Sequence, residues 1–404
     1  MPASRDRRRI ALALLCLAAA AMIAAMLAPR YPFDAGDWLL RWREMRALKT
    51  GVDPFDIFTR RVQDPVYVSL LDAHPGDPAV HNYAPWAYGF CFPAAYLSRR
   101  GAVVAAAVGN ALALFLLAGL IFALAHDRTG RSDRAAAIAA AALLLDLFPL
   151  FRAFTVGNFS IVAAAAAFAL ALLLERKRDL LAGAMLALLM LKIQIGLVFL
   201  VPLVLGRRWR TLAVGGALCF AAACLPAACV GKSPLTLAWQ LLFSGDPSFL
   251  SPYTGGLFSI FARHLSAPML LAADAVVALG VLGFVSWRLR DRGDWLLKLA
   301  PAAAIVPLWN YSQTIDLCLL LVPLVYFLIR LERAETRRER GFAALAILFF
   351  SAGLAHALWN ILVLSGWFIR PEGLGGLFVG GLALAYLGWL AILLLLARER
   401  PDHS

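Results

Sequence analysis

Two aspartates, Asp34 and Asp37, follow the first long apolar run of the sequence, in the stretch YPFDAGDWLLRWREMR. A carboxylate beside a membrane surface can take a proton from an incoming hydroxyl group, so this stretch predicts a general base at the boundary of water and lipid. A structural interpretation is also open, in which Asp37 caps an amphipathic helix. The residues alone do not decide which of the two carboxylates would be the base.

A lysine lies between two apolar runs, residues 179–191 and 194–206, in the stretch LKIQ. Each run would form a helix of roughly 20 Å, too short to cross a membrane alone. The pattern therefore predicts a broken hairpin whose tip holds Lys192 and Gln194 below the membrane surface. An ammonium group at that depth marks a functional site by default. The alternative is that Lys192 extends to the lipid headgroups.

Other side chains near these positions predict contacts with a substrate. A phosphate leaving group needs a nearby cation, for which Lys192 is the first choice and Arg152 the second, with Arg41 also in reach of the first outer loop. Tyr83 and Trp86 suit either stacking on a sugar or anchoring at the headgroups. His81 is either a substrate contact or a solvated loop residue. No cluster of residues dictates a metal ion, and the sequence leaves open whether a divalent cation helps to hold the phosphate.

Composition fixes the elements that must position these residues. Hydrophobic residues make up 62% of the 404 positions, and the mean hydropathy is +0.76. Apolar runs recur over the whole length, and most approach the roughly 20 residues of a membrane-spanning helix. We therefore expect an all-α polytopic membrane protein, with residues 1–404 as a single integral membrane domain. The formal charge is +13, and the Lys and Arg residues lie in the short connectors between apolar runs. This pattern indicates which connectors face the cytoplasm and does not indicate a nucleic-acid partner.

Basic connectors on the cytoplasmic side set the predicted topology. About twelve spans result, with both termini inside. They cover residues 10–29, 101–125, 135–150, 155–174, 179–191, 194–206, 211–230, 267–287, 295–308, 314–330, 341–363 and 373–396. The run 10–29 is taken as a retained helix and not as a cleaved signal peptide.

Two large outer loops follow from this topology. Residues 30–100 would form the catalytic loop, with an interfacial helix at 84–97, and residues 231–266 would form the second loop. The protein would thus be a multi-pass protein of the plasma (inner) membrane, with its active site facing the periplasm or the exterior. Membrane lipids are its expected surroundings.

Several motifs in order carry a resemblance to a known family. They are Asp37, GVDPF at 51–55, YAPWAYGFCFPAAYL at 83–97, Gly157-Asn158, Lys192 and GRRWR at 206–210. With this order and spacing, residues 30–320 resemble glycosyltransferase family 87. The resemblance implies a GT-C-like helical bundle that transfers a sugar, mannose in most members, from a polyprenyl-phosphate donor to a glycan or glycolipid acceptor, with inversion. The family's acid in the first outer loop falls on Asp37, and Asp34 is the second choice.

The chain departs from the family pattern at four places. Phe55 replaces a tyrosine, Ala84 replaces the first proline of a pair, and Asn158 replaces a glutamine. A histidine often found late in the family is absent from VPLWNYSQTIDL, where Gln313 is the nearest polar candidate. The rival function is a transporter or flippase of lipid-linked sugars. The two halves of the sequence show no internal repeat, which favours the enzyme.

Overall fold

The computed structural model describes residues 35–54, 83–243, 267–309, 314–351 and 388–396. Within these ranges the regular elements are all helices. Several predicted features lie outside the described residues, namely the first span at 10–29, most of the last span at 373–396, and the candidate site residues Asp34, His81 and Gln313.

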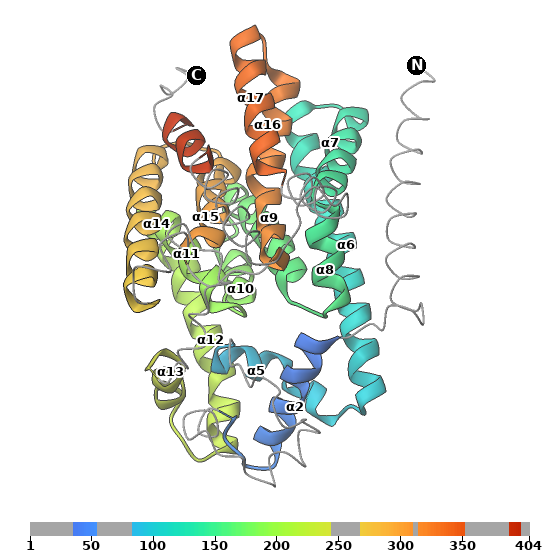
Figure 1. The fold of residues 1–404 in the computed structure, drawn as a ribbon, viewed down its shortest axis with the longest axis vertical. Coiled ribbons are helices and arrows are strands. Elements are labelled where there is room, and N and C mark those ends of the chain that lie inside the picture. The colour runs from blue at the N-terminus through green and yellow to red at the C-terminus, as the bar shows by residue number, and fades with distance from the viewer. Residues whose placement is uncertain (1–34, 55–82, 244–266, 310–313, 352–387, 397–404) are drawn as a thin grey trace, which may run out of the picture.

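The helices follow one another along the chain with short connections (Figure 1). They are α2 (Gly36–Lys49), α5 (Pro85–Cys91), η1 (Phe92–Tyr96), α6 (Arg99–Thr129), α7 (Ser132–Leu145), α8 (Leu147–Thr155), α9 (Ser160–Glu175), α10 (Asp179–Leu189), α11 (Ile193–Leu205), α12 (Trp209–Cys229), α13 (Pro234–Phe243), α14 (Ala267–Leu289), α15 (Trp295–Trp309), η4 (Thr314–Leu320), α16 (Leu321–Arg333) and α17 (Arg337–Phe350). Residues 388–396 form a further helical stretch.

Two of the described helices, α6 and α12, are long and apolar enough to cross a membrane. The pair α7 and α8 makes a third candidate, bent by 64° at the break between them. The single helix predicted at 135–150 is therefore wrong in its bounds, because α7 ends at Leu145 and Asp146 separates it from α8. Asp146 is fully buried, and neither carboxylate oxygen has a hydrogen-bond partner within the described residues.

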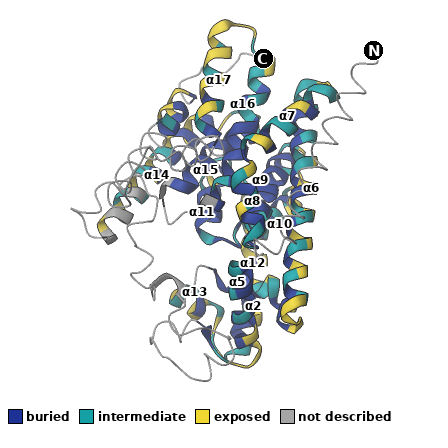
Figure 2. Cartoon of the chain, turned by 45° about the vertical axis from the view of Figure 1, so that its right-hand side comes forward, coloured by how far each residue is buried: buried dark blue, intermediate teal, exposed yellow. Residues whose placement is uncertain are grey.

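Between the charged ends of α6 the exposed side chains are apolar, as expected of a surface that meets lipid. Val104, Val108, Leu112 and Phe115 all lie on this exposed face. Figure 2 shows α6 at the edge of the molecule, while the buried residues concentrate on helices such as α9 and α15 inside the bundle.

The predicted broken hairpin is present. Its two arms are α10 and α11, which have 11 and 13 residues, and Lys192 occupies the N-cap position of α11. Lys192 is 4% exposed, so the alternative that its side chain extends to the headgroups is wrong.

Two apolar cores organise the molecule. The larger one lies inside the helical bundle and includes Phe168, Phe199 and Phe327. The smaller one lies in a layer formed by α2, α5, η1 and the adjoining ends of α6 and α12, and includes Trp42, Met45 and Tyr88. Figure 1 shows this end layer, together with α13, at the opposite end of the molecule from α17.

Close helix packing in the end layer depends on a glycine. A Cβ atom at Gly89 of α5 would lie 1.9 Å from the carbonyl oxygen of Ala222 in α12. Any larger residue there would force α5 away from α12.

Ion pairs join the basic connectors that were predicted to share the cytoplasmic face. Arg128 contacts Glu175 at 2.6 Å and Asp294 at 2.8 Å, which ties together the ends of α6 and α9 and the start of α15. The guanidinium of Arg208 lies 3.5 Å from Asp179 and also over the ring of Trp295. These contacts bring four connectors distant in sequence to one end of the bundle.

Candidate active site

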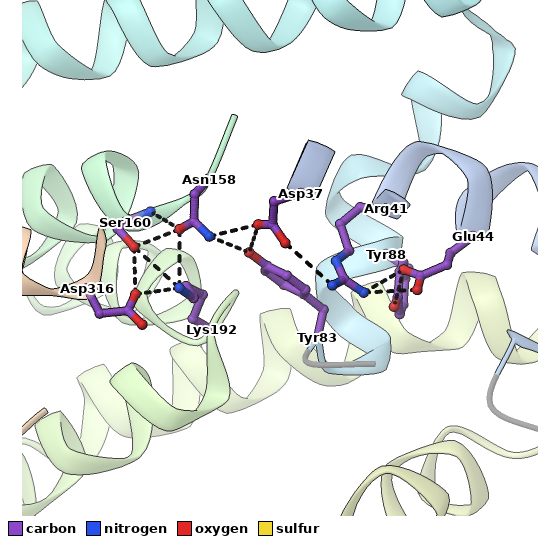
Figure 3. Close-up of polar contacts among 9 residues, drawn as sticks. All are labelled: Asp37, Arg41, Glu44, Tyr83, Tyr88, Asn158, Ser160, Lys192 and Asp316. Atoms are coloured by element: carbon purple, nitrogen blue, oxygen red, sulfur yellow. Dashed lines mark hydrogen bonds and ion pairs between the residues drawn. The ribbon is translucent and has the colours of Figure 1, made fainter. Parts of the chain in front are cut away.

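Asp37 lies in the first turn of α2, and its side chain is 25% exposed. Its Oδ2 atom accepts hydrogen bonds from the Tyr83 hydroxyl at 2.9 Å and from the Asn158 amide at 2.7 Å. Its Oδ1 atom lies 3.5 Å from a guanidinium nitrogen of Arg41 (Figure 3). One carboxylate oxygen is thus held by two neutral donors, while the other makes a single long contact.

The prediction that Asp37 caps α2 is wrong. The N-cap residue is Ala35, and no side chain caps the helix. The amide of Trp38, which a capping side chain would accept, donates instead to the carbonyl of Val156 at 3.4 Å, and the amide of Ala35 donates to Thr155 at 3.3 Å. The carbonyl of Val156 thus takes the place of a side-chain cap for Trp38, and the carboxylate of Asp37 faces other partners.

The turn after α8 receives the start of α2 because it contains a glycine. Gly157 has a φ of +68°, and a Cβ atom there would lie 2.8 Å from the Cβ of Trp38. Two indole groups fix α2 further, since Trp38 donates to the carbonyl of Ala102 at 2.8 Å and Trp42 donates to that of Leu97 at 3.2 Å. The backbone next to Asp37 is therefore held on two sides.

Arg41 lies beside Asp37 and is 3% exposed. One guanidinium nitrogen of Arg41 donates to both carboxylate oxygens of Glu44 at 2.9 Å, and the Tyr88 hydroxyl donates to Glu44 at 2.7 Å. Burial opposes the charge of Arg41, but Glu44 and the neighbouring groups outweigh that effect and raise the pKa of Arg41.

Tyr83 lies between Asp37 and Arg41, and the Arg41 guanidinium stands 4.5 Å from the centre of its ring. Burial, and then the charge of Asp37, raise the pKa of Tyr83 well above its ordinary value. The phenol therefore keeps its proton and donates a hydrogen bond to Asp37.

Asn158 joins Asp37 to a second buried group. Its amide nitrogen faces Asp37, and its oxygen accepts from the Lys192 ammonium at 3.2 Å and from the backbone amide of Ser160 at 2.9 Å. Lys192 also pairs with Asp316, and the Ser160 hydroxyl lies 2.7 Å from an oxygen of Asp316. We call the nine residues of Figure 3, from Asp316 to Glu44, the polar chain.

The structure brings five of the predicted site residues together in the polar chain. These are Asp37, Arg41, Tyr83, Asn158 and Lys192. Trp86 lies nearby, where its indole donates to the carbonyl of Met190 at 2.7 Å and so anchors the hairpin tip. Gln194 is buried in the first turn of α11, whereas Arg152 is exposed in the last turn of α8.

Sequence reasoning missed Glu44 and Ser160 as members of the polar chain. Glu44 could have been found, because it follows Arg41 by three residues and such a pair shares one face of a helix. Ser160 stands two residues after Asn158, and its role depends on a turn that only the structure shows. The described residues hold no group of three or more His, Cys, Asp or Glu side chains suited to a metal ion.

The structure thus combines a bundle of apolar helices with a buried polar chain, in the middle of which the carboxylate of Asp37 is partly exposed. The sequence profile of glycosyltransferase family 87 matches residues 81–309, which is more than half of the chain, and the protein belongs to that family. It is therefore a membrane glycosyltransferase of a family that uses polyprenyl-phosphate sugars. Searches of curated proteins and of solved structures found no match.

Proposed function

We propose that the protein transfers a sugar, mannose in the first instance, from a polyprenyl-phosphate donor to a glycan or glycolipid acceptor on the outer face of the membrane. Asp37 acts as the general base, and the anomeric carbon is inverted. The observation that carries this proposal is the position of Asp37, whose carboxylate is partly exposed while the rest of the polar chain behind it is buried.

The chemistry is a single displacement. The acceptor hydroxyl oxygen attacks the anomeric carbon, the bond from that carbon to the phosphate oxygen breaks, and the lipid leaves as polyprenyl phosphate. The hydroxyl proton passes to Asp37. Oδ1 is the oxygen suited to receive it, because Tyr83 and Asn158 already donate to Oδ2.

The donor phosphate needs a cation, and the geometry favours Arg152 over the first choice from the sequence. Lys192 is paired with Asp316, and Arg41 is held by Glu44. Arg152 is exposed, and it stands three residues before the carbonyl of Thr155, which receives the amide of Ala35 at the start of α2. In this proposal Lys192 orients Asn158, and Arg152 meets the phosphate charge.

The ion-paired connectors support an outward-facing site. Basic connectors favour the cytoplasmic side, and contacts of Arg128 and Arg208 gather them at one end of the bundle. Figure 1 places α2 and α5 at the other end. Asp37 would then face the exterior, where a lipid-linked donor and a water-soluble or lipid-bound acceptor can meet.

A transfer assay tests the proposal. Purified protein in detergent receives radiolabelled polyprenyl-phosphate mannose and a membrane lipid extract, and new glycosidic product is measured. We expect the Asp37→Asn variant to lose about 10²- to 10⁴-fold in rate, the range typical of a missing general base. Asp291→Asn serves as the matched control, because its side chain is 89% exposed and lies in the connector before α15.

Two outcomes would contradict the proposal. The first is unchanged turnover by the Asp37→Asn variant. The second is movement of labelled donor across vesicles without any glycosidic product, which would support the transporter. A panel of other polyprenyl-phosphate sugars, run in the same assay, tests the assignment of mannose separately from that of the base.

A further inference from the structure

The Arg41–Glu44 pair lies directly behind the carboxylate of Asp37. The side chains of Arg41 and Glu44 are 4% and 0% exposed, and the Arg41 nitrogen that contacts Glu44 lies 2.9 Å from both of its oxygens. The other terminal nitrogen of Arg41 stays 3.5 Å from Oδ1 of Asp37. Of these two carboxylates, the guanidinium therefore lies closer to that of Glu44 than to that of Asp37.

This division matters because a close guanidinium would weaken Asp37 as a base. A cation that pairs fully with a carboxylate stabilises the ionised form and reduces its tendency to take a proton. A second anion that shares the positive charge of the arginine limits this effect. Glu44 occupies that position, and the Tyr88 hydroxyl holds it there at 2.7 Å.

The described groups from other elements that contact Asp37 carry no charge. Tyr83, from the segment before α5, and Asn158, from the turn before α9, are neutral donors. Beyond Asn158, Lys192 of the hairpin tip and Asp316 of η4 neutralise each other as an ion pair. Among the described residues, the charged side chains of Arg41 and Glu44 are therefore the ones on α2 that bear most directly on Asp37.

We propose that Glu44 is a positioning residue that holds Arg41 away from Oδ1 of Asp37 and so keeps that oxygen available as the proton acceptor. This inference rests on the proposed role of Asp37 as the base. The sequence suggested Arg41 as a cation for the donor phosphate. In this proposal Arg41 instead influences how readily Asp37 takes a proton.

The test is the pH dependence of kcat/KM in the transfer assay, measured on full-length protein. In the Glu44→Gln variant Arg41 turns to Asp37, so the acid limb of the profile moves to lower pH by about one unit, and the plateau rate falls. In the Arg41→Gln variant Asp37 loses its cation, so the acid limb moves to higher pH. A merely structural role would lower the rate in both variants without moving the limb in opposite directions.

Two further variants guard the result. Asp291→Asn removes one exposed negative charge elsewhere and keeps the wild-type profile. The double variant Arg41→Gln/Glu44→Gln removes the buried pair as a neutral unit, which proteins commonly tolerate, and we expect its acid limb to lie between those of the two single variants. If the single variants do not fold, this double variant decides: an acid limb within about half a pH unit of wild type supports the proposal, and a limb displaced further overturns it.

The two proposals fail differently. Unchanged turnover in Asp37→Asn would contradict the proposed role of Asp37 as the base. Loss of activity in Asp37→Asn, combined with limbs that stay in place or move in the same direction in the two single variants, would remove only the role of Glu44.

Discussion

The polar chain contains two buried ion pairs, and they differ in where their partners come from. Arg41 and Glu44 are three residues apart on one turn of α2. Lys192 and Asp316 are 124 residues apart and belong to the hairpin tip and to η4. Asn158 separates the second pair from Asp37, whereas Arg41 of the first pair contacts Asp37 itself.

The difference indicates separate tasks for the two pairs. A pair within one helical turn forms wherever that helix forms, so its presence adds little to the assembly of the bundle. A pair between distant segments exists only when those segments have come together. We therefore expect the Lys192–Asp316 pair to act mainly on stability, and the Arg41–Glu44 pair to act mainly on the pH dependence of catalysis.

The largest effect that would test this contrast is expected at Lys192. Replacing Lys192 by Met leaves the buried carboxylate of Asp316 without its ammonium partner, which we expect to cost about 3–5 kcal/mol of stability. Thermal unfolding of the purified protein in detergent measures the loss. Arg41→Gln is the comparison, and a smaller loss is expected there.

The double variant Lys192→Met/Asp316→Asn supplies the control. It removes both charges and should recover most of the lost stability, because a neutral pair no longer leaves a charge buried. If Lys192→Met unfolds at the wild-type temperature, or if Arg41→Gln is the more damaging change, the two pairs do not divide the tasks in this way.

Much of the fold could be predicted from hydropathy alone. The bounds of α6, α10, α11 and α12 agree with the predicted spans to within a few residues, because long apolar runs between basic connectors leave few alternatives. The break at Asp146 had a local signal that the span predicted at 135–150 ignored, namely Pro149. A proline cannot donate to the carbonyl four residues earlier and its ring crowds that carbonyl, which here belongs to Leu145, the last residue of α7.

Some members of the polar chain could be singled out from the sequence, but the contacts that join them could not. The sequence singled out Asp37, Asn158 and Lys192 separately, through motif spacing and through the cost of a charge in a membrane. That Asn158 bridges the other two depends on the turn at 155–158, and no local pattern shows that α2 docks there. The contact of Lys192 with Asp316, 124 residues away, could not be predicted from local patterns either. The sequence therefore suggested only a phosphate as the partner of Lys192.

A smaller effect is expected at Gly157, where the start of α2 packs against the turn after α8. An alanine there must adopt a left-handed conformation, and its Cβ would lie 2.8 Å from that of Trp38. We expect a loss of about 1–3 kcal/mol of stability and about 10-fold in transfer rate, because the start of α2 and with it Asp37 must move. Unfolding temperature and kcat/KM are the measurements.

Gly130→Ala is a matched control for Gly157→Ala. Gly130 has a similar φ of +64°, but a Cβ atom there meets no atom within 4 Å. It should lose a comparable amount of stability to backbone strain and keep full activity. Equal activities in the two variants would show that the docking of α2 on the turn does not set the position of Asp37.

The smallest effect is expected at Trp86, which tests whether the hairpin tip needs the hydrogen bond that it receives from α5. Trp86→Phe keeps the aromatic ring in the end layer but removes the indole donor to the carbonyl of Met190. One such hydrogen bond contributes about 1 kcal/mol, so we expect a loss of that size in unfolding and about a fivefold fall in transfer rate. Trp209→Phe, at a position 59% exposed, is the control and should change neither.

Because Met190 lies two residues before Lys192, a fall in rate without a change in the pH profile would place Trp86 with the Lys192–Asp316 pair. A shifted acid limb would instead connect the hairpin tip to the charge balance at Asp37.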